Sequence, residues 1–238
     1  MRVALLSDIH SNWEALEAAL DYAAGQKIDE TWVLGDTVGY GANPNECLEW
    51  VIKNARQSIL GNHEEALAEP KTLEWFSGDA RRAIQWTAAV LKPEFLAEIK
   101  KLRYLYTSEN ITLAHGSPDK PEEYRYLFSS RDAVPSFRAF ETPLCFIGHT
   151  HVPSIFSEYS GRAGYLKPGV YSLDREHRYI LNPGSVGQPR DRDPRLAFGI
   201  FDEDNWTFEV VRLQYDNQKA AEKIRQAGLP VTLAARLL

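Results

Sequence analysis

Short motifs that combine histidine with aspartate, asparagine and glycine recur through the first two thirds of the chain. Five of the six histidines lie in them, and only His177 lies outside. The motifs are Ser7-Asp8-Ile9-His10, Gly35-Asp36, Gly61-Asn62-His63-Glu64, Ala114-His115-Gly116 and Gly148-His149-Thr150-His151. Imidazole, carboxylate and amide groups bind divalent metal ions, and paired ions of this kind hold and activate phosphate groups. The pattern predicts metal chemistry directed at a phosphate.

The spacing within the motifs suits two ions. An extended backbone would place Asp8 and His10 on the same side of the chain, where both can meet a single ion. His149 and His151 have the same spacing, and their Cα atoms would lie roughly 6–7 Å apart on extended backbone. That separation suits one histidine for each ion of a pair. Asp36 ends the next strand, where its two oxygens can bridge the ions.

The expected donor set leaves the identity of the metal open. Asn62 adds a neutral amide oxygen to the nitrogen and carboxylate donors, and no thiolate takes part. Such a set suits Mn, Fe, Zn, Ni or Co about equally. Cys47 and Cys145 are too few for a disulfide framework and lack zinc-site spacing, so we expect two small buried apolar side chains.

Each motif follows a segment that is typical of a buried strand. Apolar runs at 2–7, 31–34 and 58–60 alternate with helical patterns that begin at Asn12 and Pro44. This alternation predicts a mostly parallel sheet with helices outside it. Ligands bind at the carboxyl ends of the strands in such sheets, which is where the motifs fall.

The rest of the chain supplies further elements. Residues 65–100 are expected to be helical and to form either a cap over the pocket or ordinary core helices. A helix is expected near 130–140 and another near 216–227, with Asp204-Asn205 as a hairpin turn. The other predicted strands are 102–106, 111–114, 144–147, 154–157, 178–181, 196–202 and 206–213. Without an internal repeat or a low-complexity linker, a single domain over 1–238 is expected.

Composition narrows the class of protein. The 238 residues carry a net charge of −6, which argues against a duplex nucleic-acid partner but not against a nucleotide substrate. The apolar run after Met1 ends at Ser7-Asp8, shorter than the roughly 7–15 apolar residues of a secretory signal. No stretch approaches the ~20 apolar residues of a membrane span. We expect a cytoplasmic protein without a membrane partner, and the sequence does not indicate its oligomeric state.

The order and identity of the motifs resemble those of the calcineurin-like metallophosphoesterase superfamily over residues 8–151. The run Asn182-Pro183-Gly184-Ser185-Val186-Gly187, with Gly41 and Pro44, resembles the small bacterial and archaeal phosphodiesterases of that superfamily. The resemblance implies a four-layer α/β/β/α sandwich, of mixed α/β class (α+β or α/β). It implies two divalent ions, the first held by Asp8, His10, Asp36 and His151 and the second by Asp36, Asn62, His115 and His149. His63 would be the catalytic imidazole.

This resemblance implies hydrolysis of a small phosphodiester or nucleotide by a hydroxide that bridges the metals. A phosphomonoesterase and a dinucleoside polyphosphate hydrolase share the same ligand set and remain alternatives. A non-catalytic module is a third, because the retromer scaffold subunit of this superfamily has lost the catalytic histidine. His63 and every expected ligand are present here, which argues against a scaffold.

The sequence departs from the protein phosphatases of the superfamily at one motif. They carry Gly-Asp-x-x-Asp-Arg-Gly, whereas Gly39 and Tyr40 replace the second Asp and the Arg here. The group that orients His63 is therefore unknown, and a phosphoserine phosphatase loses support. Arg190 and Arg192 are candidates for replacement phosphate contacts, with Arg195 beside them, and a solvated loop with local ion pairs is the alternative.

Two further features are expected to be structural. His177 is predicted to lie at the surface, outside the site. A cluster of aromatic residues near the fourth motif is expected to pack within a sheet, with a base-stacking platform as the less favoured alternative. Its members are Tyr104, Tyr106, Tyr124, Tyr126 and Phe128.

Overall fold

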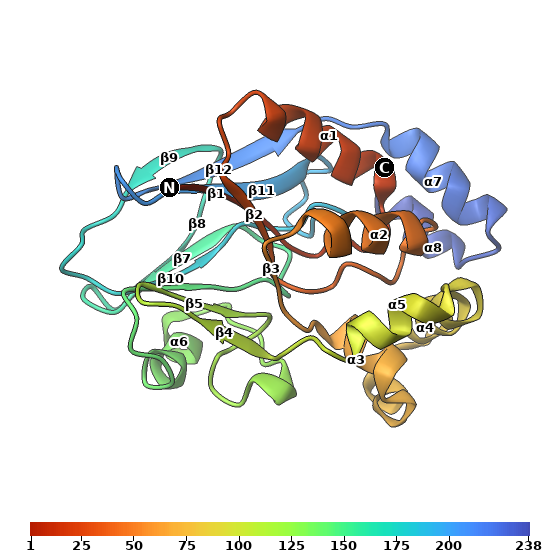
Figure 1. The fold of residues 1–238 in the computed structure, drawn as a ribbon, viewed down its shortest axis with the longest axis horizontal. Helices are drawn as coiled ribbons and strands as arrows, with labels where there is room; N and C mark the ends of the chain where they lie inside the picture. The colour runs from red at the N-terminus through yellow and green to blue at the C-terminus, as the bar shows by residue number, and fades with distance from the viewer.

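Two six-stranded sheets form the centre of the computed structural model, which describes all residues 1–238 (Figure 1). The first sheet has, in spatial order, β3 (Gln57–Ser58), β2 (Glu30–Val33), β1 (Arg2–Leu6), β11 (Leu196–Asp202), β12 (Thr207–Leu213) and β9 (Gly169–Ser172). The second has β4 (Leu105–Thr107), β5 (Ile111–Ala114), β6 (Leu144–Phe146), β10 (Tyr179–Asn182), β7 (Ser154–Ser157) and β8 (Arg162–Tyr165).

Both sheets mix parallel and antiparallel pairs. Strands β1, β2 and β3 are parallel, as the alternation of strands and helices predicts. The β11–β12 hairpin then adds to β1 in the antiparallel direction, with Val3 opposite Phe201 and Leu5 opposite Gly199. The prediction of a mostly parallel sheet is thus correct for the first sixty residues and wrong for the whole sheet, because a strand from the far end of the chain pairs with β1.

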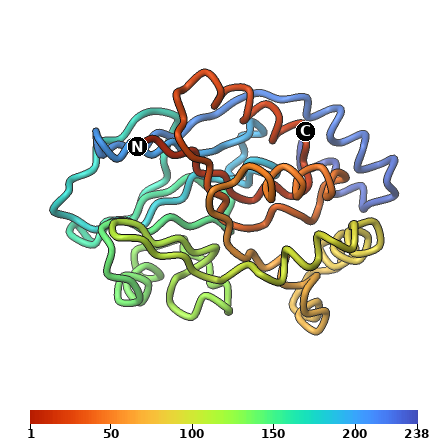
Figure 2. The backbone as a smooth tube through the Cα atoms, in the orientation of Figure 1, coloured from red at the N-terminus to blue at the C-terminus, as the bar shows by residue number.

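Helices cover the outer faces of the sheets and give a four-layer α/β/β/α sandwich (Figures 1 and 2). Helices α1 (Trp13–Ala24) and α2 (Pro44–Asn54) pack on the first sheet through a cluster that includes Leu16 and Val51. Helix α6 (Ser130–Phe137) packs on the second. Between the sheets lies a cluster of fifteen buried residues, among them Phe146. Burial of this apolar surface holds the layers together.

The segment expected to be helical contains α3 (Asn62–Ala68), the 3-10 helix η1 (Pro70–Trp75), α4 (Gly78–Val90) and α5 (Pro93–Ile99). These helices share a buried cluster with Val38, Leu48 and Leu60 of the body of the fold. Near the C-terminus, α7 (Asn217–Gln226) and α8 (Val231–Ala235) pack on α4 and on Tyr40. The first of these matches the predicted final helix, whereas α8 was not anticipated from the sequence.

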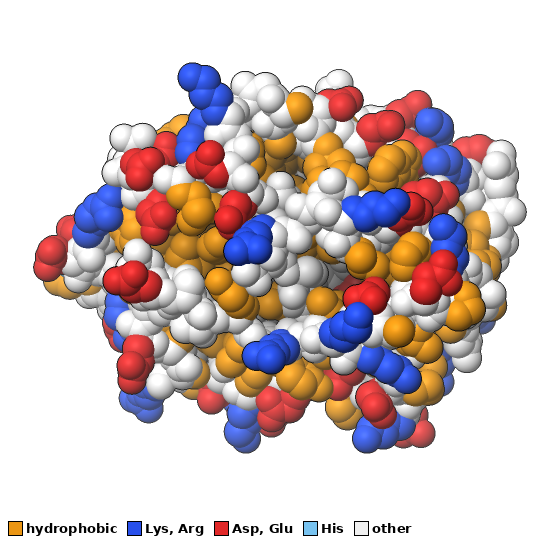
Figure 3. Space-filling model, viewed as in Figure 1, with side chains coloured by type: hydrophobic (Ala, Val, Ile, Leu, Met, Phe, Trp, Pro, Cys, Tyr) orange, Lys and Arg blue, Asp and Glu red, His pale blue; other side chains and the backbone are white.

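Two strands and a short 3-10 helix also escaped prediction. Every residue of β8 is exposed, and three of the four residues of β9 are exposed, so neither has a buried apolar run that a sequence pattern would reveal. The 3-10 helix η2 (Pro121–Glu123) lies in the loop that follows β5. No helix combines the length and the apolar character that crossing a lipid bilayer requires. On the face drawn in Figure 3, Lys and Arg side chains are interspersed with Asp and Glu.

Candidate metal centre

Most motif residues lie in loops that follow the strands, whereas Asn62, His63 and Glu64 lie in the first turn of α3. Hydrogen bonds between backbone groups join the first two of these loops. The Asp8 amide donates to the carbonyl of Gly35 (3.1 Å), and the His10 amide donates to the carbonyl of Asp36 (2.9 Å). Asp8 follows β1 and Asp36 follows β2, so the hydrogen bonds join the ends of neighbouring parallel strands. Strand pairing thereby brings distant motifs together.

The backbone is not extended at the two motifs in which the ligand residues are separated by one residue, Asp8-Ile9-His10 and His149-Thr150-His151. Asp8 and His10 have φ of 52° and 49°, and His149 and His151 have φ of 67° and 60°. These are left-handed conformations, which are uncommon for residues other than glycine and cost free energy. Residues in tight loops after the strands, rather than in the strands themselves, adopt them. The expectation of extended backbone at these motifs is wrong.

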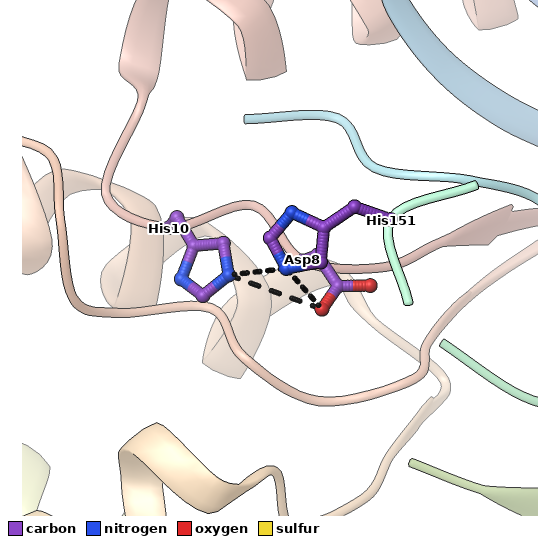
Figure 4. A group of neighbouring side chains, drawn as sticks. All are labelled: Asp8, His10 and His151. Atoms are coloured by element: carbon purple, nitrogen blue, oxygen red, sulfur yellow. Dashed lines mark hydrogen bonds and ion pairs between the residues drawn. The ribbon is translucent and has the colours of Figure 1, made fainter. Parts of the chain in front are cut away.

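Three overlapping groups of buried side chains have their ligand atoms within 4.8 Å of one another. The groups are Asp8 with His10 and His151, His10 with Asp36 and His63, and Asp36 with His115 and His149. Figure 4 shows the first group, in which the His10 and His151 rings and the Asp8 carboxylate converge. In this group the two Nε2 atoms are 3.1 Å apart. His149 and His151 therefore belong to different groups.

Asp36 is common to two of these groups. Its Oδ2 atom is 3.2 Å from Nε2 of His115, 3.7 Å from Nε2 of His10 and 4.0 Å from Nε2 of His63. Its Oδ1 atom accepts the backbone N–H of His63 at 2.9 Å. The carboxylate thus lies between two sets of imidazoles, which is the position that a bridging ligand needs.

Backbone carbonyls orient three of the imidazoles. Nδ1 of His10 bonds to the carbonyl of Val38 (3.0 Å), and Nδ1 of His115 bonds to the carbonyl of Leu34 (2.6 Å). Nδ1 of His151 bonds in the same way to the carbonyl of another loop residue, at 2.5 Å. A carbonyl accepts a hydrogen bond from the ring, so Nδ1 carries a proton and Nε2 is the atom that faces a metal ion.

Several buried polar atoms at the centre have no hydrogen-bond partner. Three of them belong to expected metal ligands: Oδ1 of Asp8, Oδ1 of Asn62 and Nε2 of His115. Nε2 of His115 lies near Oδ2 of Asp36 but outside hydrogen-bond geometry. Unsatisfied buried polar atoms are costly and rare in native proteins. These three are all of the donor types that bind divalent ions, so the residues present fit a metal centre.

The charges of the metal-free site point the same way. Burial would raise the pKa of Asp8 and of Asp36, but neighbouring imidazoles, His151 for Asp8 and His115 for Asp36, outweigh burial and hold both carboxyls well below their usual range. Burial would lower the pKa of His115, but Asp36 raises it to about 9. Burial lowers the pKa of His149 to about 3. Two buried carboxylates therefore stay ionised among these imidazoles, and bound cations would compensate their negative charge.

Comparison with known proteins agrees with this arrangement. Residues 1–205 match the family model of the calcineurin-like phosphoesterase superfamily domain. The chain belongs to the calcineurin-like phosphoesterase superfamily. The uncharacterized protein MJ0912 of Methanocaldococcus jannaschii is similar to it, with 40% identity over 240 residues that cover 99% of this chain and 96% of that protein.

Two solved structures have the same fold. The crystal structure of a metallophosphoesterase from Sphaerobacter thermophilus is 40% identical, with a TM-score of 0.90 over 100% of this chain and 98% of that one. The hypothetical protein PH1004 from Pyrococcus horikoshii OT3 is 20% identical, with a TM-score of 0.82 over 99% of this chain and 97% of that one. The sandwich expected from the resemblance is therefore confirmed.

Glu64 supports two motif loops at once, although the sequence did not single it out. Its Oε2 atom accepts the backbone N–H of Asp36 (2.8 Å) and of Gly61 (3.2 Å), and its Oε1 atom accepts that of Val38 (3.0 Å). Burial, together with the negative charge of Asp36, raises its pKa to about 7. An acid at the third position of a helix, three residues after the N-cap Gly61, is the capping-box pattern that could have identified it.

Glycine at position 61 allows the close approach of these loops. A Cβ atom there would lie 2.2 Å from Oδ1 of Asp36 and 2.3 Å from its amide nitrogen. Backbone and carboxylate cannot both move aside, so any larger residue would push Asp36 away from its neighbours. Steric contact with Asp36 thus explains why this motif position is glycine in the present chain.

His63 is held by packing and by its backbone. Its ring is 4.6 Å from the ring of His10, 4.6 Å from that of Tyr40 and 5.2 Å from that of Phe76, measured between centroids, and all three contacts are edge-on. Its Nδ1 atom has no hydrogen-bond partner. Burial lowers its pKa to about 4, although Asp36 acts in the opposite direction. No orienting group for His63 could be identified from the sequence, and in the structure aromatic side chains surround its ring.

The loop at residues 182–187 supports the centre from the other side. The Asn182 side-chain amide donates to the Gly148 carbonyl (2.6 Å), and the Ser185 hydroxyl donates to the Asp8 carbonyl (2.8 Å). The Gly187 amide donates to the same Asp8 carbonyl (2.9 Å). In the sequence this loop resembled a superfamily motif of unassigned role. In the structure it holds the first and last motifs through hydrogen bonds to Asp8 and Gly148.

The candidate arginines differ in their positions. The Arg190 guanidinium donates to the Tyr40 hydroxyl (3.3 Å), and the Arg190 amide donates to the His151 carbonyl (3.3 Å). Arg195 instead pairs with Asp193 at 2.7 Å, in agreement with the alternative of local ion pairs. Arg192 is exposed, with a φ of 67°. The structure thus brings Arg190 to Tyr40, which occupies the motif position where the protein phosphatases have arginine.

The remaining sequence candidates divide between core and surface. Tyr106 lies in β4 and packs edge-on against Trp32 at 6.2 Å, which agrees with packing in a sheet. The other four, Tyr104, Tyr124, Tyr126 and Phe128, lie outside the strands, so that expectation is wrong for them. Tyr126 and Phe128 are also exposed. His177 stacks on an exposed tyrosine, away from the motif loops. Both cysteines are free and buried, as predicted.

Proposed function

We propose that the chain is a dimetal-dependent phosphoesterase that hydrolyses a small phosphodiester or nucleotide. The observation that carries the proposal is the pair of imidazole groups that share Asp36, with unpartnered donor atoms on Asp8, Asn62 and His115. Membership of the superfamily supports hydrolysis of a phosphoric ester.

In this proposal the ligands divide between two ions. The first would be held by Asp8, His10, Asp36 and His151, and the second by Asp36, Asn62, His115 and His149. Divalent ions so bound would supply Lewis acidity for the phosphoryl oxygens and would lower the pKa of water. The donor set suits Mn, Fe, Zn, Ni or Co.

The chain's own residues account for the remaining steps. His63 would stabilise the transition state and would protonate the departing alkoxide oxygen as an imidazolium, because the neutral ring is too weak an acid for that step. Arg190, at the Tyr40 hydroxyl, would contact a phosphoryl oxygen, because a guanidinium matches phosphate geometry. The aromatic side chains around His63 would exclude water from that proton.

Two other functions remain candidates. A phosphomonoesterase or a dinucleoside polyphosphate hydrolase would use the same ligands and would differ in the substrate pocket. A non-catalytic scaffold is the third, and the presence of His63 together with every expected ligand argues against it.

The test compares bis(p-nitrophenyl) phosphate with p-nitrophenyl phosphate on protein that has been stripped by a chelator and reloaded with Mn, Ni, Zn or Mg in parallel. We expect diester hydrolysis to disappear on stripping and to return with at least one metal. Faster cleavage of the monoester would favour the phosphomonoesterase. Metal uptake without turnover of either compound would count against the proposal and favour the scaffold.

A further inference from the structure

Two aromatic side chains outside the motifs extend the candidate metal centre toward solvent. The Tyr126 ring stacks on the ring of His149, with centroids 4.1 Å apart and planes inclined by 17°. The Phe128 ring stacks in turn on Tyr126, at 5.3 Å and 12°. Tyr126 is 46% exposed and Phe128 is 52% exposed. A series of nearly parallel rings therefore begins at an expected metal ligand and ends at the surface.

The chain around these rings is anchored before any ligand binds. Leu127, between them, is 2% exposed and packs in the cluster beneath α6, which turns its two neighbours toward the other side. The Phe128 amide donates to the Asp132 carboxylate at the start of α6 (3.1 Å). The Ser117 amide closes the loop on the Arg125 carbonyl (3.0 Å). A surface that is already ordered loses little conformational entropy when a ligand binds.

Neither ring contributes to the hydrophobic core. Tyr126 and Phe128 belong to none of the five buried clusters, although each has a large apolar surface whose exposure is unfavourable. Their aromatic contacts are with each other and with His149. The aromatic surface that stays exposed beside the candidate metal centre suits a ligand with a flat, apolar part.

The two aromatic borders of the centre differ in charge. The Tyr40 ring contacts the ring of His10, an expected ligand of the first ion, and the Tyr40 hydroxyl accepts a hydrogen bond from the Arg190 guanidinium. The Tyr126 ring stacks on the ring of His149, an expected ligand of the second ion, and on its neighbour Phe128, which is exposed. An ester that joins an anionic phosphate to a flat heterocycle would match both borders.

We propose that Tyr126 and Phe128 form a stacking surface for the nucleobase of a nucleotide substrate whose phosphate lies at the metal centre. This inference rests on the proposed function, since it assumes that a phosphoester occupies the centre. Stacking of a base on an aromatic side chain contributes affinity without selecting one base, because every base has a π-face. The expected preference is for nucleotides over sugar phosphates.

The test compares two ligands that differ only in the base: adenosine 5′-monophosphate and ribose 5-phosphate. Their affinities are measured by isothermal titration calorimetry on Mn-loaded protein with His63→Ala, so that neither ligand is consumed. Ribose 5-phosphate reports on the phosphate site by itself, and the ratio of the two affinities reports on the stacking surface. Hydrolysis of the chromogenic esters by the unaltered enzyme tests the proposed function separately.

We expect the adenosine nucleotide to bind roughly tenfold more tightly than the sugar phosphate. Phe128→Leu should reduce this ratio toward one with little change in ribose 5-phosphate binding, and Phe128→Trp should retain it. Tyr126→Leu should act in the same direction. Tyr165→Leu replaces another exposed tyrosine, which lies on β8, and should leave the ratio unchanged.

Three results would overturn the inference. Equal affinities for the two ligands would show that the base is not bound. A ratio that survives in the Tyr126→Leu, Phe128→Leu double variant would place the base elsewhere. Binding of neither ligand would show that the rings and the metal centre do not act on one molecule; if ester hydrolysis persisted in that case, the proposed function would stand without the stacking surface.

Discussion

Gly39 lies directly against the imidazole of His63. A Cβ atom at position 39 would be 2.0 Å from Nδ1 and 2.8 Å from Cε1 of that ring, and Gly39 has a φ of 88°. The absence of a side chain at this position therefore makes room for the ring. In the protein phosphatases of the superfamily an aspartate stands at this motif position, so His63 in this chain depends on close packing where those members have a carboxylate.

Gly39→Ala should move His63 and lower kcat by about tenfold or more, because small displacements of a catalytic group are costly. The positive φ adds a strain of about 1–3 kcal/mol, which thermal unfolding would report as a lower Tm. Gly78→Ala is the matched control, since nothing lies within 4 Å of a Cβ there and the residue begins α4. Unchanged kcat in Gly39→Ala would contradict the packing argument.

His63→Ala should reduce turnover by roughly 100-fold or more while both metal ions remain bound. The reason is that His63 is assigned to proton donation and not to a metal. Metal content after gel filtration, measured by plasma mass spectrometry, separates the two roles. His177→Ala, at the surface histidine that pairs with Asp174 at 3.3 Å, serves as the control. Loss of one ion in His63→Ala would instead make His63 a ligand, as its place in the His10–Asp36 group allows.

Glu64→Gln should weaken metal binding and destabilise the fold. The amide would turn an N–H group toward backbone N–H groups of Val38, Asp36 or Gly61, at a cost of about 1–3 kcal/mol. Supporting residues of this kind typically change metal affinity 10–100-fold. Chemical unfolding and metal titration near pH 8, above the Glu64 pKa of about 7, would measure both effects. The exposed Glu17→Gln in α1 should change neither.

Arg190→Gln should raise KM by about tenfold, because a charge-assisted contact to phosphate contributes about 1.5 kcal/mol or more. Initial rates over a range of substrate concentrations would separate this from a change in kcat. Arg192→Gln should have a smaller effect, since only Arg190 bonds to Tyr40 and to the loop of His151. Equal effects of the two substitutions would show that both arginines reach the substrate.

Much of the fold and the residue types of the centre follow from the sequence by itself. The buried runs of β1 and β2 and the apolar stripes of α1 and α2 are local patterns that arise from burial on one face or on both. Motifs of Asp, Asn and His after such runs identify the donor atoms, because ligand chemistry depends on residue type.

Tertiary structure alone decided how these groups meet and what surrounds them. No local pattern encodes the antiparallel pairing of β11 with β1 or the contact between Gly39 and His63, because each brings together residues that are distant in the sequence. No local pattern predicted the left-handed backbone at Asp8 and His149 either. The tertiary structure likewise decided that Tyr126 is exposed whereas Tyr124, two residues earlier, is buried. Local periodicity reports which face of an element is buried, whereas the geometry of a site depends on how loops distant in the sequence pack together.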